Sequence, residues 1–410
     1  MLFDGITWVA RGNVADDELT RLVISGETRV VAENYDGFFT PVVYLRNEKN
    51  EKTVVPLWKS AATFAPRVAR ISKEELGENR RYTRFFVSWV DGYGMESPIS
   101  EPSRVNTDFA DNPGGVENVS GAYDMDLEYN DGDTIRLWTS LSGMGSDLNP
   151  AKKVRIYKVV TGTEEGRIQF IKEVAYADLA EMDYPQVDFT VKDEDAGEIL
   201  PNIEAIPKDL YCIQAVPGNF YCGIAKSLPK TVCFSDVDLI YSWPVAYRYD
   251  VEDNPVALAV TGNTVFVLTN GSPYVLTGTL PESMTVTKLG SPAACVSQRG
   301  VCVYRNSVYF ASTAGLMCIG SGSDGTVCQN LTDKIFTKRQ WQEYNPSSCI
   351  MGQHDGALHL FFTLPDGAHK GLVIDLTENA SVAVTTHDEH AKCLCVDDAT
   401  GKMYYIREGE

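Results

Sequence analysis

The five histidines are the first residues to consider for chemistry, and all of them lie between positions 354 and 390. The segment His387-Asp388-Glu389-His390 holds two imidazoles and two carboxylates, and both kinds of group bind Zn²⁺ in proteins. Its spacing matches no zinc signature, and it lies in a predicted loop. We therefore interpret the segment as a solvated loop, with a metal site as the alternative.

A run of acidic residues in the first half resembles the start of a calcium-binding loop. The sixth position of that frame is Tyr129, where the tight turn of such a loop requires glycine. The stretch Asp193-Glu194-Asp195 with Gly197 fits the pattern equally loosely. We interpret both as acidic surface turns and assign no metal-ligating residue. The run consists of Asp124, Asp126, Glu128, Asp131 and Asp133.

Carboxylates that lie close in sequence could form the acid and base of a glycosidase. Nothing in the sequence shows that the cluster near position 240 faces inward, and Ser323-Asp324-Gly325-Thr326 lacks the spacing and the Trp of a sialidase aspartate box. The chain has no P-loop, nucleophile elbow or dinucleotide fingerprint. We therefore assign no catalytic or cofactor-binding residue and no cofactor, and we expect a protein that is not an enzyme. The cluster consists of Asp236, Asp238, Asp250 and Glu252.

The ten cysteines all lie between Cys212 and Cys395, and no two form a C-x-x-C pair. Most of them stand within strand-like apolar runs. In a protein folded in the cytosol, this pattern is typical of buried, reduced thiols that serve as small apolar side chains. Disulfides are the alternative if the mature protein meets an oxidising medium.

The charge of the chain excludes several partners. Its 410 residues include 56 acidic and 36 basic side chains, which gives a net charge of −20 and a pI near 4.7. Such a surface repels nucleic acids and anionic membranes, whereas the wall of a pore through which DNA slides would benefit from this charge. The first residues do not form a secretory signal, and no apolar run approaches the roughly 18 residues of a membrane span. We expect cytosolic folding and no stable membrane insertion.

The elements that would position these side chains are β-hairpins. Five turn-like segments recur from position 218 to position 399 with steps of 44, 44, 49 and 44 residues, each between short apolar stretches. This period predicts the blades of a β-propeller over residues 204–410. Trp243 is expected to pack within a blade, with an interface anchor as the alternative. The turns are Pro217-Gly218-Asn219, Gly262-Asn263, Arg305-Asn306, Asp355-Gly356 and Asp397-Asp398 with Gly401.

Residues 66–203 have a different texture. Alternating apolar and polar residues recur there every 10 to 20 positions, with turn signals between them. This pattern predicts a β-sandwich of the immunoglobulin or fibronectin III class. The predicted strands include residues 81–90, 134–138, 154–160, 168–174 and 187–191.

Residues 1–65 contain further strand-like stretches, with a hairpin signal at Ser25-Gly26 and another at residues 47–52. A propeller often closes its ring with strands from the opposite terminus of the chain. We therefore predict that residues 1–65 complete the propeller and that the sandwich is an insertion. Short helical turns are expected at residues 281–284 and 338–344.

Several short motifs, taken together in their order, resemble the tail nozzle proteins of short-tailed bacteriophages, also called tail tubular protein B-like virion proteins. In the second half these are Phe234-Ser235-Asp236 with Trp243-Pro244, then residues 267–278, residues 308–312 with Gly315-Leu316, and residues 330–332 with Trp341 and Asn345-Pro346. In the first half they are residues 91–103 and residues 154–160 with Gly162. The resemblance covers residues 80–410, and the first 65 residues match poorly.

The resemblance implies an all-β protein, a propeller with an inserted sandwich, that acts as a structural protein of the virion tail. It implies a homo-oligomeric ring, usually a hexamer, below the portal and adaptor, assembled in the host cytoplasm. The implied partners are head-to-tail adaptor or portal proteins and tail fibre or needle proteins, with DNA passing transiently through the lumen during genome ejection. Six copies would carry a charge of about −120. The alternatives are a propeller-based carbohydrate-binding or depolymerising tail protein and a propeller adaptor that binds other proteins.

Overall fold

The computed structural model divides into two compact units. The first comprises Met1–Val54, Pro207–Ile240 and Val245–Glu410, and the second comprises Val55–Ile206 and Tyr241–Pro244. Residues 55–65, which we expected in the N-terminal segment, thus belong to the second unit. The structure describes residues 2–3, 8–9, 29–35, 38–46, 52–57, 59–106, 122–146, 149–160, 167–192, 197–200, 203–290, 292–322, 325–376, 383–397 and 402–407.

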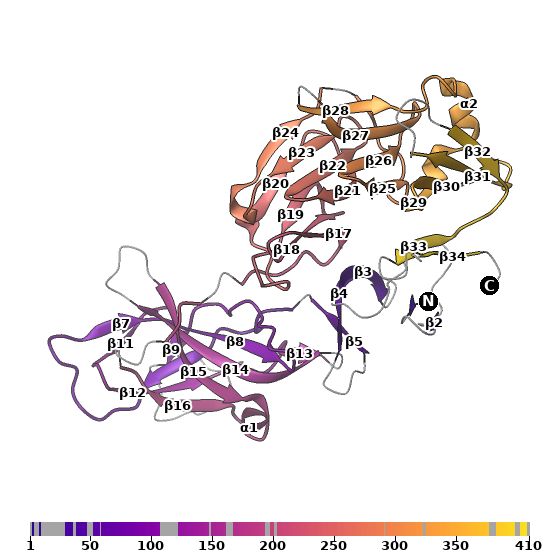
Figure 1. Cartoon of the computed structure of the whole chain (residues 1–410). Coiled ribbons are helices and arrows are strands. Elements are labelled where there is room, and N and C mark those ends of the chain that lie inside the picture. Colours follow the sequence, from indigo (N-terminus) through magenta and orange to yellow (C-terminus); the bar gives the residue numbers. More distant parts are fainter. Residues whose placement is uncertain are drawn as a thin grey trace. The chain divides into compact units, whose positions relative to one another are not determined.

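The first unit is a β-propeller whose blades are antiparallel meanders. Four consecutive sheets have four strands each, in sequence order (Figure 1). The first is β17 (Leu210–Val216), β18 (Phe220–Ala225), β19 (Leu228–Phe234) and β20 (Arg248–Asp250), and the second is β21 (Pro255–Thr261), β22 (Thr264–Thr269), β23 (Tyr274–Thr277) and β24 (Thr285–Lys288). The third is β25 (Val301–Tyr304), β26 (Ser307–Ala311), β27 (Leu316–Gly322) and β28 (Gly325–Asn330), and the fourth is β29 (Ile350–His354), β30 (Ala357–Thr363), β31 (His369–Asp375) and β32 (Ala383–His387).

Two shorter sheets flank these four blades. A three-stranded sheet of β3 (Arg29–Tyr35), β4 (Phe38–Arg46) and β5 (Lys52–Pro56) lies beside β17, and a two-stranded sheet of β33 (Cys393–Asp397) and β34 (Lys402–Ile406) lies beside β29. The first strands of the blades are neighbours in the order β3, β17, β21, β25, β29, β33. The N-terminal strands therefore form a sheet of their own next to β17. The pair β1 (Leu2–Phe3) and β2 (Trp8–Val9) is antiparallel.

The evenly spaced turns join the first strand of each blade to the second, as the period predicted. The backbone at these turns is left-handed, which is the conformation that lets a two-residue hairpin match the twist of its strands. Both central residues have positive φ at Arg305-Asn306 (46° and 61°) and at Asp355-Gly356 (50° and 77°). The turn between β33 and β34 lies outside the described residues, as does the expected hairpin at Ser25-Gly26.

The two expected helical turns are present. One is the short 3-10 helix Pro281–Ser283, and the other is α2 (Lys338–Glu343). Thr337 begins α2 with a capping box, because its hydroxyl accepts from the backbone N–H of Gln340 while the Gln340 side chain accepts from Thr337. Trp341 projects from this helix into the core and is fully buried. Two further 3-10 turns are Val245–Tyr247 and Pro346–Ser348.

The second unit contains two larger sheets and one small one. A five-stranded sheet has the order β10 (Ala122–Tyr123), β9 (Arg104–Asn106), β6 (Arg67–Arg70), β12 (Thr134–Trp138) and β16 (Gln186–Thr190). The other large sheet joins β8 (Phe85–Asp91), β14 (Asn149–Val160), β15 (Arg167–Ala175) and β13 (Gly145–Ser146), while β7 (Arg81–Thr83) pairs with β11 (Leu127–Tyr129). The short helix α1 (Tyr176–Ala180) follows β15.

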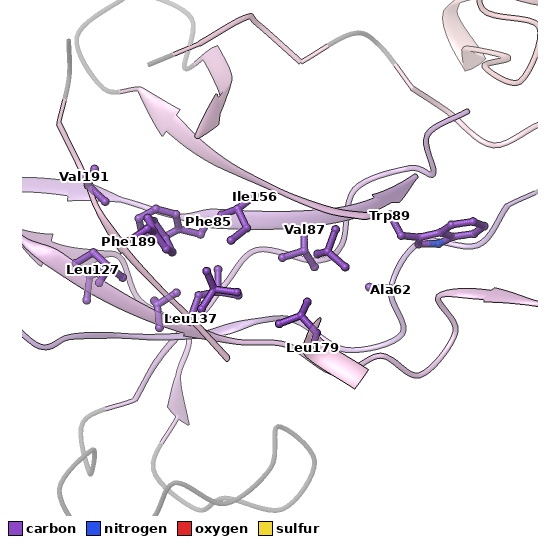
Figure 2. Packing of buried hydrophobic residues seen from close by; sticks show 14 of the residues in the cluster. Ala62, Phe85, Val87, Trp89, Leu127, Leu137, Ile156, Leu179, Phe189 and Val191 are labelled. Atoms are coloured by element: carbon purple, nitrogen blue, oxygen red, sulfur yellow. The ribbon is translucent and has the colours of Figure 1, made fainter. Parts of the chain in front are cut away.

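Both large sheets contribute side chains to one buried cluster. Figure 2 shows Phe85 and Val87 of β8 near Leu137 of β12, with Leu179 of α1 close by. The rings of Phe85 and Phe189 meet edge to face at 5.5 Å. Burying each such side chain contributes about 1.5–3 kcal/mol. The assignment of this unit to the immunoglobulin or fibronectin III type stays a prediction.

The structure differs from the expected single, half-buried strand at residues 81–90. The strand is divided after Thr83, and every residue of β8 is buried. An alternating pattern does not predict this, because the polar side chains of β8 are buried together with their hydrogen-bond partners. Ser88 donates to Glu96, and Asp91 accepts from Lys59.

Trp243 does not pack within a blade. The segment Tyr241–Pro244 interrupts the first unit between β19 and β20 and belongs to the second. The N–H of Trp243 donates to the carbonyl of Glu204 at 2.9 Å, and the N–H of Glu204 donates to the hydroxyl of Ser242 at 3.1 Å. Trp243 and Ser242 are both 0% exposed. The tryptophan is therefore a buried residue that belongs to the second unit.

Candidate functional site

The segment after β8 contains one of the motifs on which the resemblance rests, residues 91–103. Three serines of this segment form hydrogen bonds with the backbone of β8. The N–H of Ser100 donates to the carbonyl of Val87 at 2.8 Å, and the Ser100 hydroxyl accepts from the N–H of Val87 at 3.1 Å. This pattern occurs three times, at serines spaced three residues apart, and all three serines are buried. The hydroxyls replace the carbonyls of a regular ladder. The other two pairs are Ser97 with Trp89 and Ser103 with Phe85.

Glu96 precedes this serine series and is 2% exposed. Its carboxylate accepts from the guanidinium of Arg155 at 2.8 Å and from the hydroxyls of Ser88 and Tyr157. Burial and the Glu96 carboxylate raise the pKa of Tyr157 above its usual range, so the phenol stays a donor. The carboxylate is fully engaged in holding three strand residues, and this arrangement is structural.

Two blade turns in the resemblance motifs are closed in the same way. The hydroxyl of Thr269, at the end of β22, accepts from the N–H of Gly271 at 3.0 Å and donates to the carbonyl of Ser272 at 2.6 Å. The hydroxyl of Ser312, just after β26, accepts from the N–H of Gly315 at 3.2 Å and donates to its carbonyl at 2.8 Å. Thr269 and Ser312 are 0% and 1% exposed. These motif residues therefore shape the blades.

The acidic run that resembled a calcium loop is divided among four arginines, of which Arg80 pairs with Glu128 at 3.2 Å. Arg84 contacts Asp126 at 2.6 Å and also contacts Asp124. Asp131 lies 3.4 Å from Arg81, and the buried Asp133 accepts from Arg70 and, at 2.6 Å, from the N–H of Asn130. Although burial opposes it, the hydrogen bonds from Arg70 and Asn130 lower the pKa of Asp133. The other proposed loop, residues 193–196, lies outside the described residues.

The carboxylates that could have formed a glycosidase pair have separate partners. Asp250 accepts from the hydroxyl of Thr231 at 2.6 Å, and Asp236 accepts from the N–H of Val237 at 2.8 Å. Glu252 pairs with Lys288, whose ammonium lies 5.6 Å from the ring centre of Tyr274. Asp238 has a positive φ of 60°. Ser323 and Asp324 lie outside the described residues.

The segment from His387 to His390 was interpreted as a solvated loop, but His387 belongs to a strand and both histidine rings contact other rings. His387 ends β32, and its ring meets Phe361 edge to face at 5.2 Å. His390 stacks on His369 at 3.8 Å. Burial lowers the pKa of His387, with Glu389 opposing it, and burial followed by His354 and His387 lowers the pKa of His359. In the described part of the chain, no group of three metal-binding side chains gathers.

Nine of the ten cysteines have side chains that the structure describes, and these nine are thiols, six of them buried and three half-buried. Burial raises the pKa of Cys295 and of Cys302 to about 12 and that of Cys233 to about 11. Thiols with such pKa values are unreactive at neutral pH. They pack as apolar side chains, as the sequence pattern predicted.

A cavity of about 770 Å³ lies among the first strands of the blades. Its lining comes from β17, β21, β25, β29 and β33, together with the segment before β25 and the turn after β18. Composition and spacing did not predict it. The only available signal was that Tyr211-Cys212-Ile213-Gln214 mixes polar and apolar residues within an innermost strand.

No protein-family model matches the sequence, and no curated protein matches it. Among solved structures, two of AztD from Citrobacter koseri are similar at 12% and 13% identity, cover 80% and 79% of this chain and 77% and 75% of their own, and have TM-scores of 0.33 and 0.32. A structure of Hsv2 from Kluyvelomyces marxianus is similar at 10% identity over 64% of each chain, with a TM-score of 0.28. These scores are low, so the propeller assignment rests on the blades described above. No described helix has the length and apolar character needed to cross a membrane.

Proposed function

We propose that this propeller-based chain is a structural protein of a bacteriophage tail, of the nozzle type, and that it forms a ring around the channel through which DNA leaves the particle. The observation that carries the proposal is the role of the residues on which the resemblance rests. Ser97, Ser100 and Ser103 fasten a strand, while Thr269 and Ser312 close blade turns. Such motifs encode architecture, which agrees with a protein that acts through assembly.

The charge of the chain supports the same proposal. A net charge of −20 per copy makes a ring of copies strongly acidic. A negative wall repels the phosphate backbone, so a DNA column can slide along it without being held. Interfaces between the copies of a permanent ring bury more than about 2,000 Å² each. The expected partners are further copies of the chain, adaptor or portal proteins, and tail fibre or needle proteins.

Negative-stain electron microscopy of the purified full-length chain tests the proposal. We expect closed rings with a central pore wide enough for a hydrated DNA duplex. Monodisperse single chains that cleave polysaccharide would overturn it in favour of a carbohydrate-depolymerising propeller. As a second readout, labelled duplex DNA should show no change in fluorescence anisotropy with the protein even at low salt, where binding through phosphate contacts is strongest.

A further inference from the structure

The cavity among the first strands of the blades carries an inference that does not rest on the proposed function. At about 770 Å³ it has the size of a small-molecule site. Five strands from five different blade sheets converge on it, so its walls are held by the framework of the propeller. A site on rigid strands keeps its shape before a ligand arrives, which lowers the entropic cost of binding.

One wall of the cavity departs from regular strand geometry. The register between β17 and β18 shifts between Tyr211 and Gln214, and Cys212 has a positive φ of 53°. Non-glycine residues rarely adopt this conformation, and such bulges redirect side chains near binding sites. As a result, all four consecutive residues from Tyr211 to Gln214 line the cavity. The N–H of Leu258 on β21 lies 3.2 Å from the Sγ of Cys212, which holds the distortion in place.

The polar part of the lining is rich in hydrogen-bond donors and cationic. Among the lining residues that the structure describes, three are glutamines, two are basic and none is aspartate or glutamate, although 56 of the 410 residues of the chain are acidic. Burial raises the pKa of Tyr211, so the phenol at this wall keeps its proton. Much of the remaining lining is aliphatic. The basic residues are Lys226 and Arg299, and the glutamines are Gln214, Gln298 and Gln353.

Arg299 is tied to two neighbouring blades at the edge of this cavity. Its carbonyl accepts from the N–H of Met351 at the start of β29 at 3.0 Å, and its guanidinium donates to the carbonyl of Lys392 at 2.7 Å. These bonds place a planar cation at the cavity, and one of its five N–H donors is bonded to the Lys392 carbonyl. A guanidinium in this setting recognises carboxylate, sulfonate or phosphate groups.

We propose that the cavity among the first strands of the blades binds a small amphipathic organic anion, with the anionic group at Arg299 and Lys226 and an apolar body against the aliphatic residues of these strands. The chemistry of the lining defines the ligand by one anionic headgroup and an apolar body small enough for the cavity. A neutral molecule with the same body would lose the headgroup contacts, and a cation would meet two like charges.

Fluorescence titration of the full-length protein with a matched pair of probes tests this proposal. Anilinonaphthalene sulfonate carries an aromatic body and one sulfonate, and phenylnaphthylamine has the same body without the charge. We expect the sulfonate to bind once per chain and about tenfold or more tightly than the neutral probe, since hydrogen bonds to charged groups are the strong ones. Equal affinity for the two probes would overturn the proposal.

Two variants locate the site. Arg299→Gln should remove most of the preference for the sulfonate, while Arg299→Lys should restore part of it. Val303→Trp, at a lining residue that is 41% exposed, should abolish binding of both probes with little cost to folding. Lys230→Gln, an exposed basic residue of β19 outside the lining, is the control and should bind like the parent chain. Sulfonate binding that survives both Arg299→Gln and Val303→Trp would contradict the proposal.

Discussion

Ser100 forms two hydrogen bonds with the backbone of Val87. Its N–H donates to the Val87 carbonyl at 2.8 Å, and its hydroxyl accepts from the Val87 N–H at 3.1 Å. The side chain thus does what a backbone carbonyl does in a regular ladder. Three such pairs let a proline-containing segment, with fewer backbone donors, cover the edge of β8. The backbone N–H and carbonyl groups of Phe85, Val87 and Trp89 therefore have hydrogen-bond partners along this edge, and every residue of β8 is buried.

Replacing Ser100 by alanine should destabilise the second unit. The Val87 N–H would keep its buried position but lose its acceptor, which costs about 1–3 kcal/mol. Urea unfolding followed by tryptophan fluorescence measures the change. Ser142→Ala, at an exposed serine of the same unit, is the matched control and should unfold like the parent chain. Equal midpoints for Ser100→Ala and Ser142→Ala would refute the role of the serine series.

Glu96→Gln should cost about 2–4 kcal/mol of unfolding free energy. The amide keeps the volume of the side chain but removes the charge that Arg155 faces, and it cannot accept from Ser88 and Tyr157 as well as a carboxylate does. The same urea experiment applies. Glu128→Gln removes a carboxylate from an exposed pair with Arg80, 3.2 Å apart, and should leave stability within experimental scatter. A small effect at Glu96, similar to that at Glu128, would show that the buried network is dispensable.

The stability of the first unit should fall as the pH is lowered below about 6.5. The pKa values of His359 and His387 are lowered in the folded protein, chiefly by burial. Between the lowered pKa and the unfolded value, the unfolded chain binds protons that the folded chain does not, so folding weakens through this window. Thermal unfolding across the pH range should show this slope. A double variant, His359→Gln with His387→Gln, should reduce the dependence of the unfolding temperature on pH. An unchanged dependence would show that these two histidines do not cause it.

The cysteines should resist thiol reagents in the native protein. Burial raises the pKa values of Cys295 and Cys302 to about 12, so little thiolate forms at neutral pH. A chromogenic disulfide reagent should therefore react slowly with the folded chain and rapidly with ten thiols in urea. Fewer than ten thiols in urea without reductant would reveal disulfides.

Removing residues 1–54 should destabilise the propeller. The strand β3 lies beside β17, so its removal leaves one flank of that inner strand without a neighbour. We expect the remaining chain to show a lower unfolding midpoint and faster proteolysis within residues 207–410. If the shortened chain unfolds at the same urea concentration as the whole chain, the N-terminal sheet is not part of the propeller framework.

The sequence predicts the blades well because their turns have strict backbone requirements. Pairs such as Asp355-Gly356 favour the left-handed backbone, and their spacing of about 44 residues reflects one blade. For Trp243 the same reasoning gave a wrong prediction. Its position between two strands of one blade indicated packing there, whereas contacts distant in sequence place it beside Glu204 in the second unit. Local patterns carry no information about such contacts.

The cavity also lay beyond prediction. The distortion at Cys212 depends on pairing between β17 and β18, and the approach of Arg299 to Lys392 joins residues far apart in the chain. The acidic run near Asp124, which we interpreted as surface turns, pairs with Arg84 from another part of the chain, and the sequence did not predict that pairing. Residue types alone do not reveal which charges will face one another.

The proposed role as a ring-forming tail protein is tested most directly by negative-stain electron microscopy of the purified full-length chain. The prediction is a population of closed rings of identical subunits, usually six, with an open pore that admits a DNA duplex. A uniform population of single chains that releases sugar from polysaccharide would contradict it.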